Sequence, residues 1–227
     1  MEIITDTTIL SNKSEEVDLD SGYRNVLGGL VGMFERNTLG LAAPQLGIMQ
    51  RMFVALLYNK TVPSLYGFVN PRFERKGKKE VPSTEACLSI PDVTRTVLRH
   101  NYIEVNFDKC FQISDEGQWE EVEGPMQLSA RDAFVFQHEY DHLEGTLLTD
   151  HTDIGNPVEW WAKQALKKRQ KIKQRQKNAP KNLTKPDKVN PKKQAQLRKM
   201  EKARRKKNRM LAKRKAQLEF MEKESSA

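Results

Sequence analysis

The charge of the chain is divided between two segments, and this division limits what each segment can fold into. Residues 162–227 contain 25 of the 39 lysine and arginine residues of the 227-residue sequence but only 5 of its 30 aspartate and glutamate residues. That segment therefore has a formal charge of +20, and residues 1–161 have one of −11. A segment so rich in like charge cannot pack a core alone, whereas about 160 residues can. We expect a globular domain at residues 1–160 and a basic C-terminal extension at residues 161–227.

The sequence also indicates a cellular compartment. It contains no apolar run of about 18 residues, and its first residues lack the basic and apolar regions of a secretory signal. We therefore expect a cytoplasmic protein without a membrane segment. Cys87 and Cys110 are too few for a disulfide framework, so each is a free thiol, a ligand or a core residue.

Local patterns predict both helices and antiparallel strands. Apolar residues at helical spacing predict a helix within residues 21–37. Ser129 and Asp132 have the spacing of a capping box and Gly145 is a stop signal, which together predict a helix over residues 130–143. Short apolar or alternating runs predict strands at residues 51–58, 66–70 and 102–107.

The helix predicted at residues 130–143 contains a His-Glu-x-x-His pattern. His138 and His142 are four residues apart, so they project from one helix face and can bind one metal ion. In such a site Glu139 accepts a proton from the water that the metal activates. Helical histidines at this spacing can also be hydrogen-bonded surface residues. A catalytic metal needs a third protein ligand, and the candidate is Cys87 in the segment EACLSIP; the alternative is a small buried hydrophobe, which suits Cys110.

A third motif, LGLAAPQLG at residues 39–47, combines small residues with the amide side chain of Gln45. The motifs GLAAPQ, EACLS and QHExDH, in this order and at these separations, resemble those of the peptide deformylases over about residues 1–160. The resemblance implies an α+β fold with a central HExxH helix surrounded by antiparallel β-sheets. It also implies metal ligation by Cys87, His138 and His142, catalysis by Glu139 as general base, and an oxyanion hole formed by the Gln45 side chain and the Leu88 backbone N–H.

The resemblance further implies the reaction and the cofactor. The enzyme would remove the formyl group from the N-formylmethionine of nascent polypeptides and release formate, using one divalent ion per chain. Members of the family use Fe²⁺, and Zn²⁺, Ni²⁺ or Co²⁺ can take its place. The substrate-binding residues that the resemblance implies are Leu39, Gly40, Ala86, Phe134 and Val135. Core packing is the alternative interpretation of Phe134 and Val135.

Two positions depart from the family's pattern. Thr38 and Ala86 stand where the family usually has glycine, and Ala86 adjoins Cys87. Alanine tolerates a positive φ poorly, so the added methyl could restrict the backbone or narrow the cleft. Neither change removes a ligand, the base or an oxyanion donor, so we expect activity.

A helix is predicted to begin at Asn156 and Pro157 and to run into the basic extension, which continues as a proline-punctuated linker and a second helix. Such an arm can bind RNA through its phosphates, and in this family it would dock on the ribosome. The alternative is a solvated, disordered tail. We expect a monomer.

Two other functions are compatible with parts of the sequence. A zinc peptidase built on HExxH would leave Cys87 and Gln45 without a role. A non-catalytic RNA-binding protein would explain the tail, Thr38 and Ala86, but it would have no need of the base Glu139.

Overall fold

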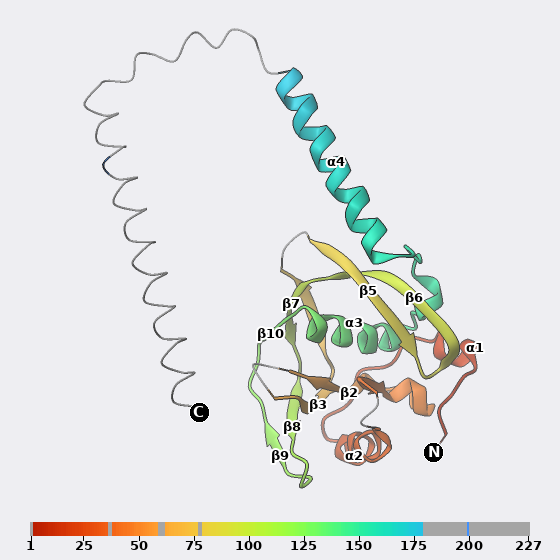
Figure 1. The fold of residues 1–227 in the computed structure, drawn as a ribbon. Helices are drawn as coiled ribbons and strands as arrows, with labels where there is room; N and C mark the ends of the chain where they lie inside the picture. The colour runs from red at the N-terminus through yellow and green to blue at the C-terminus, as the bar shows by residue number, and fades with distance from the viewer. Residues whose placement is uncertain (1, 36–37, 59–61, 77–78, 179–198, 200–227) are drawn as a thin grey trace, which may run out of the picture. The chain divides into compact units, whose positions relative to one another are not determined.

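The computed structural model describes residues 2–35, 38–58, 62–76, 79–178 and 199 (Figure 1). The chain forms two compact units, Met1–Lys168 and Arg169–Ala227. The proline-punctuated linker and the second tail helix, both predicted from the sequence, lie outside the described residues.

Antiparallel sheets form the framework of the first unit. The described strands form a five-stranded sheet of order β1-β2-β3-β8-β9, a three-stranded sheet of order β10-β7-β4, and the pair β5-β6. The strands are β1 (Gly40–Ala42), β2 (Met52–Leu57), β3 (Ser64–Val69), β4 (Arg72–Arg75), β5 (Glu80–Cys87), β6 (Ile90–His100), β7 (Tyr102–Asn106), β8 (Lys109–Ile113), β9 (Trp119–Glu121) and β10 (Met126–Ser129). The helices are α1 (Thr7–Leu10), α2 (Tyr23–Met33), α3 (Arg131–Leu143), α4 (Pro157–Lys177) and the 3-10 turns η1 (Ala43–Leu46) and η2 (Leu148–Asp150).

The five-stranded sheet is buried on both faces, which explains the continuous apolar run of β2. Met52 and Val54 pack in the cluster that contains Leu27 and Leu30 of α2. Phe53 belongs to the cluster on the opposite side, since side chains alternate along a strand. The α+β class is therefore confirmed, with α2 and α3 covering opposite faces of this sheet (Figure 1).

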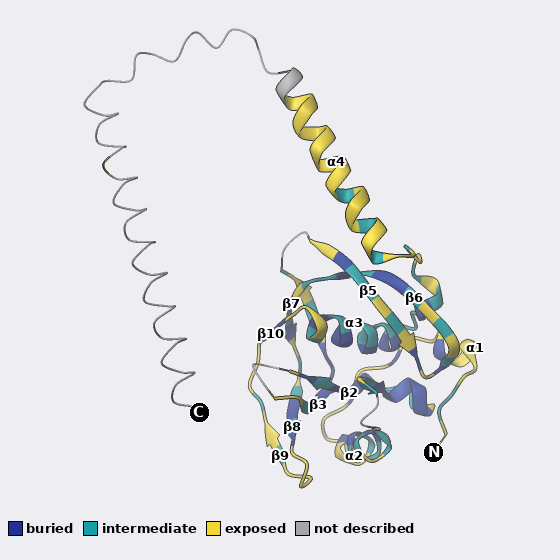
Figure 2. Cartoon of the chain, viewed as in Figure 1, coloured by how far each residue is buried: buried dark blue, intermediate teal, exposed yellow. Residues whose placement is uncertain are grey.

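Helix α3 packs against β1, β2, β6 and β10, which belong to all three sheets. The rings of Phe53 and Phe136 lie 5.1 Å apart and those of Phe68 and Phe136 5.3 Å apart, both edge to face. Figure 2 shows α3 with buried and half-buried residues along most of its length. A helix enclosed in this way positions its side chains rigidly.

The strands predicted at residues 51–58, 66–70 and 102–107 are confirmed as β2, β3 and β7. The first predicted helix is shorter than residues 21–37. It begins after Gly22, which has φ 76°, and ends before Phe34, whose ψ of 123° is extended. A helix-like apolar pattern therefore continues past the last helical residue.

The predicted N-cap of α3 is wrong. Ser129 is the last residue of β10, where it pairs with Tyr102, and this pairing keeps it in the sheet. The N-cap is Ala130, with φ 51° and no side-chain cap hydrogen bond. Asp132 accepts a hydrogen bond of 3.0 Å from the backbone N–H of Tyr58 instead. The predicted end is correct, since Gly145 has φ 70° just beyond the helix.

Helix α4 begins where the sequence predicts. The Asn156 side chain accepts a hydrogen bond of 2.8 Å from the backbone N–H of Val158, which caps the helix. Its large apolar residues Val158, Trp161, Leu166 and Ile172 are exposed. None of the helices in the described ranges is both long enough and apolar enough to cross a membrane.

Candidate metal centre

Three elements bring the motif residues together. Helix α3 carries His138, Glu139 and His142, and η1 carries Gln45. Cys87 is the last residue of β5, at a register shift in which it pairs with Ile90 across a tight turn. The turn places the thiol at the end of the β5-β6 hairpin, against the helix.

The donor atoms of Cys87, His138 and His142 all lie within 4.8 Å of one another. The Cys87 Sγ and the His142 Nε2 are 3.3 Å apart. A tetrahedral ion with bonds of about 2.3 Å to sulfur and about 2.0 Å to nitrogen separates such atoms by about 3.6 Å. The three donors are therefore spaced to hold one ion, and a thiolate with two imidazoles suits iron or zinc.

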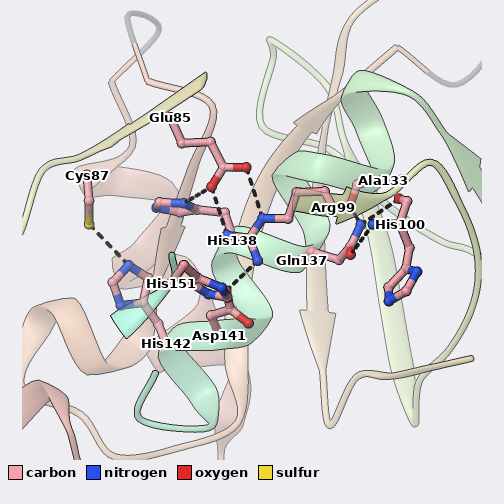
Figure 3. A network of polar contacts seen from close by, with 10 residues as sticks. All are labelled: Glu85, Cys87, Arg99, His100, Ala133, Gln137, His138, Asp141, His142 and His151. Carbon is pink, nitrogen blue, oxygen red and sulfur yellow. Dashed lines mark hydrogen bonds and ion pairs between the residues drawn. The ribbon is translucent and has the colours of Figure 1, made fainter. Parts of the chain in front are cut away.

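A buried ion-pair network orients the first histidine (Figure 3). Glu85 lies 3.0 Å from the Nδ1 of His138 and accepts two hydrogen bonds from Arg99, of 2.9 and 2.7 Å. A carboxylate on one ring nitrogen leaves the other nitrogen, Nε2, available to a metal. Arg99 is only 3% exposed, so it fixes Glu85 without competition from bulk water.

The network continues away from the metal centre (Figure 3). Asp141 accepts a hydrogen bond of 2.5 Å from Arg99 and lies 2.8 Å from the Nε2 of His151. The Gln137 side chain bonds both backbone groups of His100, at 3.0 and 2.9 Å. These contacts tie α3 to β6 and to the segment that follows η2.

Sequence reasoning gave no role to Glu85, Arg99, Gln137 or His151. Glu85 and Gln137 lie inside the quoted motifs, so their position was a usable signal. Arg99 and His151 lie outside every motif, and their contacts depend on the tertiary fold. Asp141 and Glu144 pair with Arg99 and Arg51, and the ring of Tyr140 packs against that of Phe136.

The electrostatics differ between the two histidines. Burial disfavours protonation of His138, but its contacts with Cys87 and Glu85 outweigh burial and raise its pKa to about 10. Burial, together with the positive charge of His138, lowers the pKa of His142 to about 3. Burial would raise the pKa of Glu85, but His138 and Arg99 lower it to about 2. His142 is therefore neutral, which is the form that binds a metal.

The pKa of Glu139 is shifted in the opposite direction from that of Glu85. Burial raises its pKa to about 7, against the opposing effect of His138. Its Oε2 is buried and has no hydrogen-bond partner among the described residues. A carboxylate with an unused buried oxygen beside three metal donors fits a base that acts on a bound water. The unpartnered oxygen of Glu139 therefore fits a site that takes a divalent ion and its water.

The Gln45 amide also lies close to Cys87. Its Oε1 accepts a hydrogen bond of 2.8 Å from the Ala42 backbone N–H. Its Nε2 donates to the Ser89 hydroxyl at 3.2 Å and lies 3.8 Å from the Cys87 Sγ. The side chain is 2% exposed, so its N–H group is held in one orientation beside the thiol.

A cavity of about 790 Å³ opens beside these groups. Its lining contains all five substrate-binding residues predicted from the sequence: Leu39, Gly40, Ala86, Phe134 and Val135. Leu88 and Thr38, one of the two residues that differ from the family's pattern, also line it. Leu39 is 41% exposed and Leu88 48% exposed, whereas Val135 is buried. The cavity wall thus combines exposed apolar groups with core residues.

Ala86 and Gly40 show how closely this wall is packed. Ala86 is not among the described residues with positive φ, so its methyl group imposes no backbone strain of that kind. A Cβ atom on Gly40 would lie 2.3 Å from the Oε1 of Glu139. Gly40 therefore contacts the carboxylate as well as the cavity.

This arrangement of a helix-borne His-Glu-x-x-His, a thiol and an amide beside a cavity is typical of a metal-dependent hydrolase. Residues 1–156 match the family described as polypeptide deformylase. The chain belongs to the peptide deformylase family and is a hydrolase of that kind.

Individual relatives agree with this assignment. The chain is 33% identical over 147 residues to a peptide deformylase of Clostridium botulinum, covering 64% of this chain and 90% of the relative. A relative from Cytophaga hutchinsonii is 36% identical over 142 residues, covering 59% and 72%. The crystal structure of a probable peptide deformylase from Synechococcus phage S-SSM7 superposes with a TM-score of 0.50 at 31% identity, covering 67% of this chain and 99% of that chain.

Proposed function

We propose that this chain removes the formyl group from the N-terminal formylmethionine of nascent polypeptides, with Cys87, His138 and His142 as the ligands of one divalent metal ion. The observation that carries the proposal is the convergence of these three donors within 4.8 Å, next to the unpartnered buried oxygen of Glu139. Fe²⁺ is the proposed ion. When bound, it would lower the pKa of a water molecule and polarise the formyl oxygen.

The protein's own groups supply the remaining chemistry. Glu139 accepts a proton from the water that attacks the formyl carbon. The Gln45 Nε2 and the Leu88 backbone N–H donate hydrogen bonds to the oxygen on which negative charge develops, and loss of one such donor costs about 3 kcal/mol. Glu139 then returns the proton to the amide nitrogen, the C–N bond breaks, and formate and a free amino terminus are released.

Binding of the methionine side chain is assigned to the apolar part of the cavity, between Leu39, Phe134 and Val135. These residues lie on the same side of α3 as His138 or face it across the cavity. A zinc peptidase is disfavoured because Gln45 is buried against Cys87, an arrangement that serves a small carbonyl group next to the metal.

The test is formate release from a formyl-Met-Ala peptide by the full chain loaded with Fe²⁺ or Ni²⁺ without oxygen. Glu139→Gln should retain the metal and lose at least about 100-fold in kcat, because general-base catalysis contributes about 10²–10⁴. A variant that binds metal and keeps the wild-type rate would exclude Glu139 as the base. Metal-loaded wild-type protein that releases no formate would refute the function.

We further propose that the basic extension, with its boundary near residue 160, docks on ribosomal RNA. In the part of α4 whose side chains the structure describes, seven lysine and arginine side chains are exposed: Lys163, Lys167, Lys168, Arg169, Lys171, Lys173 and Arg175. Neutralising phosphates with such residues releases counterions, so affinity should fall steeply with salt. We propose that the protein acts as a cytoplasmic monomer on chains that emerge from the ribosome.

Co-sedimentation of the full chain with ribosomes tests the extension. We expect binding to weaken at least about 10-fold between about 50 and 200 mM salt. Replacing Lys167, Lys168, Lys171 and Lys173 with glutamine should weaken it further at low salt, with formate release from a short peptide unchanged. Binding that is independent of salt and of these lysines would contradict the proposal.

A further inference from the structure

One cationic side chain in the cavity wall has no role in the chemistry described above. Arg131 is the only lysine or arginine among the described residues that line the cavity, and it begins α3. The other charged groups of the wall are engaged, since Glu85 is paired with Arg99 and Glu139 faces the metal donors. Arg131 forms no ion pair with any carboxylate in the described part of the chain.

The guanidinium of Arg131 is nevertheless held in place. It lies over the ring of Tyr58, 4.4 Å from the ring centroid. Asp132, the nearest carboxylate in sequence, is turned to the Tyr58 backbone N–H at 3.0 Å. A guanidinium held over an aromatic ring still has N–H groups to donate, and its planar fork matches a carboxylate in two hydrogen bonds.

The position of Arg131 on the helix defines which part of a substrate it reaches. Phe134, Val135 and His138 follow it at three, four and seven residues, so all four side chains share one face of α3. Seven residues correspond to about 10 Å along the helix axis. A peptide that begins at the metal centre and runs along this face therefore reaches Arg131 two residues after formylmethionine.

The alternation of side chains along an extended peptide determines which substrate residue faces Arg131. In an extended peptide, the first and third side chains point the same way and are about 7 Å apart, while the second points away. If the methionine side chain lies against Phe134 and Val135, the third side chain also faces α3, near Arg131. We propose that Arg131 is a specificity-determining residue that favours peptides with aspartate or glutamate at the third position, formylmethionine being the first. This inference rests on the proposed function of the same site.

The test compares kcat/KM for the peptides formyl-Met-Ala-X, with X as glutamate, alanine or lysine, using the metal-loaded full chain. Glutamate should exceed alanine by about 2- to 5-fold, through KM, because a partly exposed ion pair contributes only modestly. Arg131→Gln should bring the ratio to about 1, and Arg131→Glu should make lysine the better residue. Calorimetric Kd values for the products Met-Ala-Glu and Met-Ala-Lys should follow the same order.

Arg24→Gln is the matched control. Arg24 is also exposed and stacked on an aromatic ring, 4.6 Å from the centroid of Phe111, but it is not part of the cavity. This variant should keep the wild-type preference.

Three results would overturn the inference. Equal kcat/KM for all three peptides removes the preference while the deformylase function stands. An equal gain from glutamate at the second position, in formyl-Met-Glu-Ala, removes the assignment to the third. Formate release from none of the peptides refutes the proposed function, and the inference with it.

Discussion

Gly40 shows how one residue can hold the proposed base in place. A Cβ atom there would lie 2.3 Å from the Oε1 and 2.4 Å from the carboxyl carbon of Glu139, so Gly40→Ala must displace that carboxylate. Since a misplacement of about 1 Å can cost about 100-fold in rate, we expect kcat to fall by one to two orders of magnitude. Steady-state formate release measures this, with circular dichroism to confirm folding.

Gly28→Ala is the control for this substitution. A Cβ atom at Gly28 in α2 meets nothing within 4 Å, and alanine favours a helix over glycine by about 1 kcal/mol. This variant should keep wild-type kcat and unfold at a slightly higher temperature. Wild-type activity in Gly40→Ala would show that the position of Glu139 is not restricted by β1.

The two cysteines have different environments, which predicts different reactivity. Cys110 is fully buried in the core, where burial raises the pKa of its thiol. Cys87 lines the cavity. In metal-free native protein, iodoacetamide at about pH 8 should therefore modify Cys87 and spare Cys110, because the thiolate is the reactive form.

Mass spectrometry of the labelled protein checks this prediction. Bound Zn²⁺ should protect Cys87, and Cys87→Ser should remain unlabelled until urea is added. Rapid labelling of Cys110 in the native protein would contradict its place in the core, and labelling of Cys87 that Zn²⁺ does not slow would argue against its role as a ligand.

Much of the candidate site could be predicted at the residue scale, because helical spacing alone places His138 and His142 on one face. The hydrogen bonds between Glu85 and Arg99 could not be predicted from the sequence. Glu85 faces Arg95 in the β5-β6 register and bonds Arg99, four residues further along β6, so the pair depends on a strand register that no local pattern specifies. The same holds for Gln137 and the backbone of His100.

Elements differ in how much of them local sequence determines. The run that forms β2 is apolar on consecutive positions because both of its faces are covered, and a short apolar run of this kind predicts a strand from sequence. Strands β5 and β6 are rich in polar and charged residues, many of them half-buried or exposed, so no apolar pattern in the sequence predicts these strands. The capping signal of Ser129 predicts the wrong N-cap for α3, because the pairing of β10 with β7 keeps Ser129 in the sheet.

Asn70 joins three segments of the chain that are far apart in sequence, which predicts a large effect of its removal. It has φ 49°, is 2% exposed, and exchanges two hydrogen bonds with the backbone of Val17, of 2.8 and 2.9 Å. It also donates to Asp108 at 2.8 Å. Asn70→Ala leaves buried groups unpaired and places alanine at positive φ, so we expect a loss of about 2–4 kcal/mol in the free energy of unfolding.

Urea denaturation of the two proteins measures this loss. Asn12→Ala is the matched control, since Asn12 also donates two side-chain hydrogen bonds, to Thr8 and Ile9, but is exposed. It should cost less than about 1 kcal/mol. Equal effects of the two substitutions would mean that the buried contacts of Asn70 contribute no more than exposed ones.

At the scale of the whole molecule, the division of charge predicts where a core can form. The acidic segment contains the clusters around α2 and α3, whereas α4 has no buried apolar side chain among its described residues. Charge does not determine which sheets form, since their pairing joins residues far apart in sequence, such as β3 and β8.

Metal binding should stabilise the whole first unit, because its proposed ligands come from both β5 and α3 and converge only in the folded state. A ligand at about 100 times its Kd adds about 2.7 kcal/mol to the free energy of unfolding if the unfolded chain does not bind it. We therefore expect Tm to rise by several degrees when Zn²⁺ is added to chelator-treated protein. Calorimetry of both forms measures the shift, and Cys87→Ser, which lacks one ligand, should show a smaller one. Identical Tm values at one bound ion per chain would mean that the unfolded chain binds the ion as tightly as the folded one, and would contradict a site formed only when the hairpin packs against the helix.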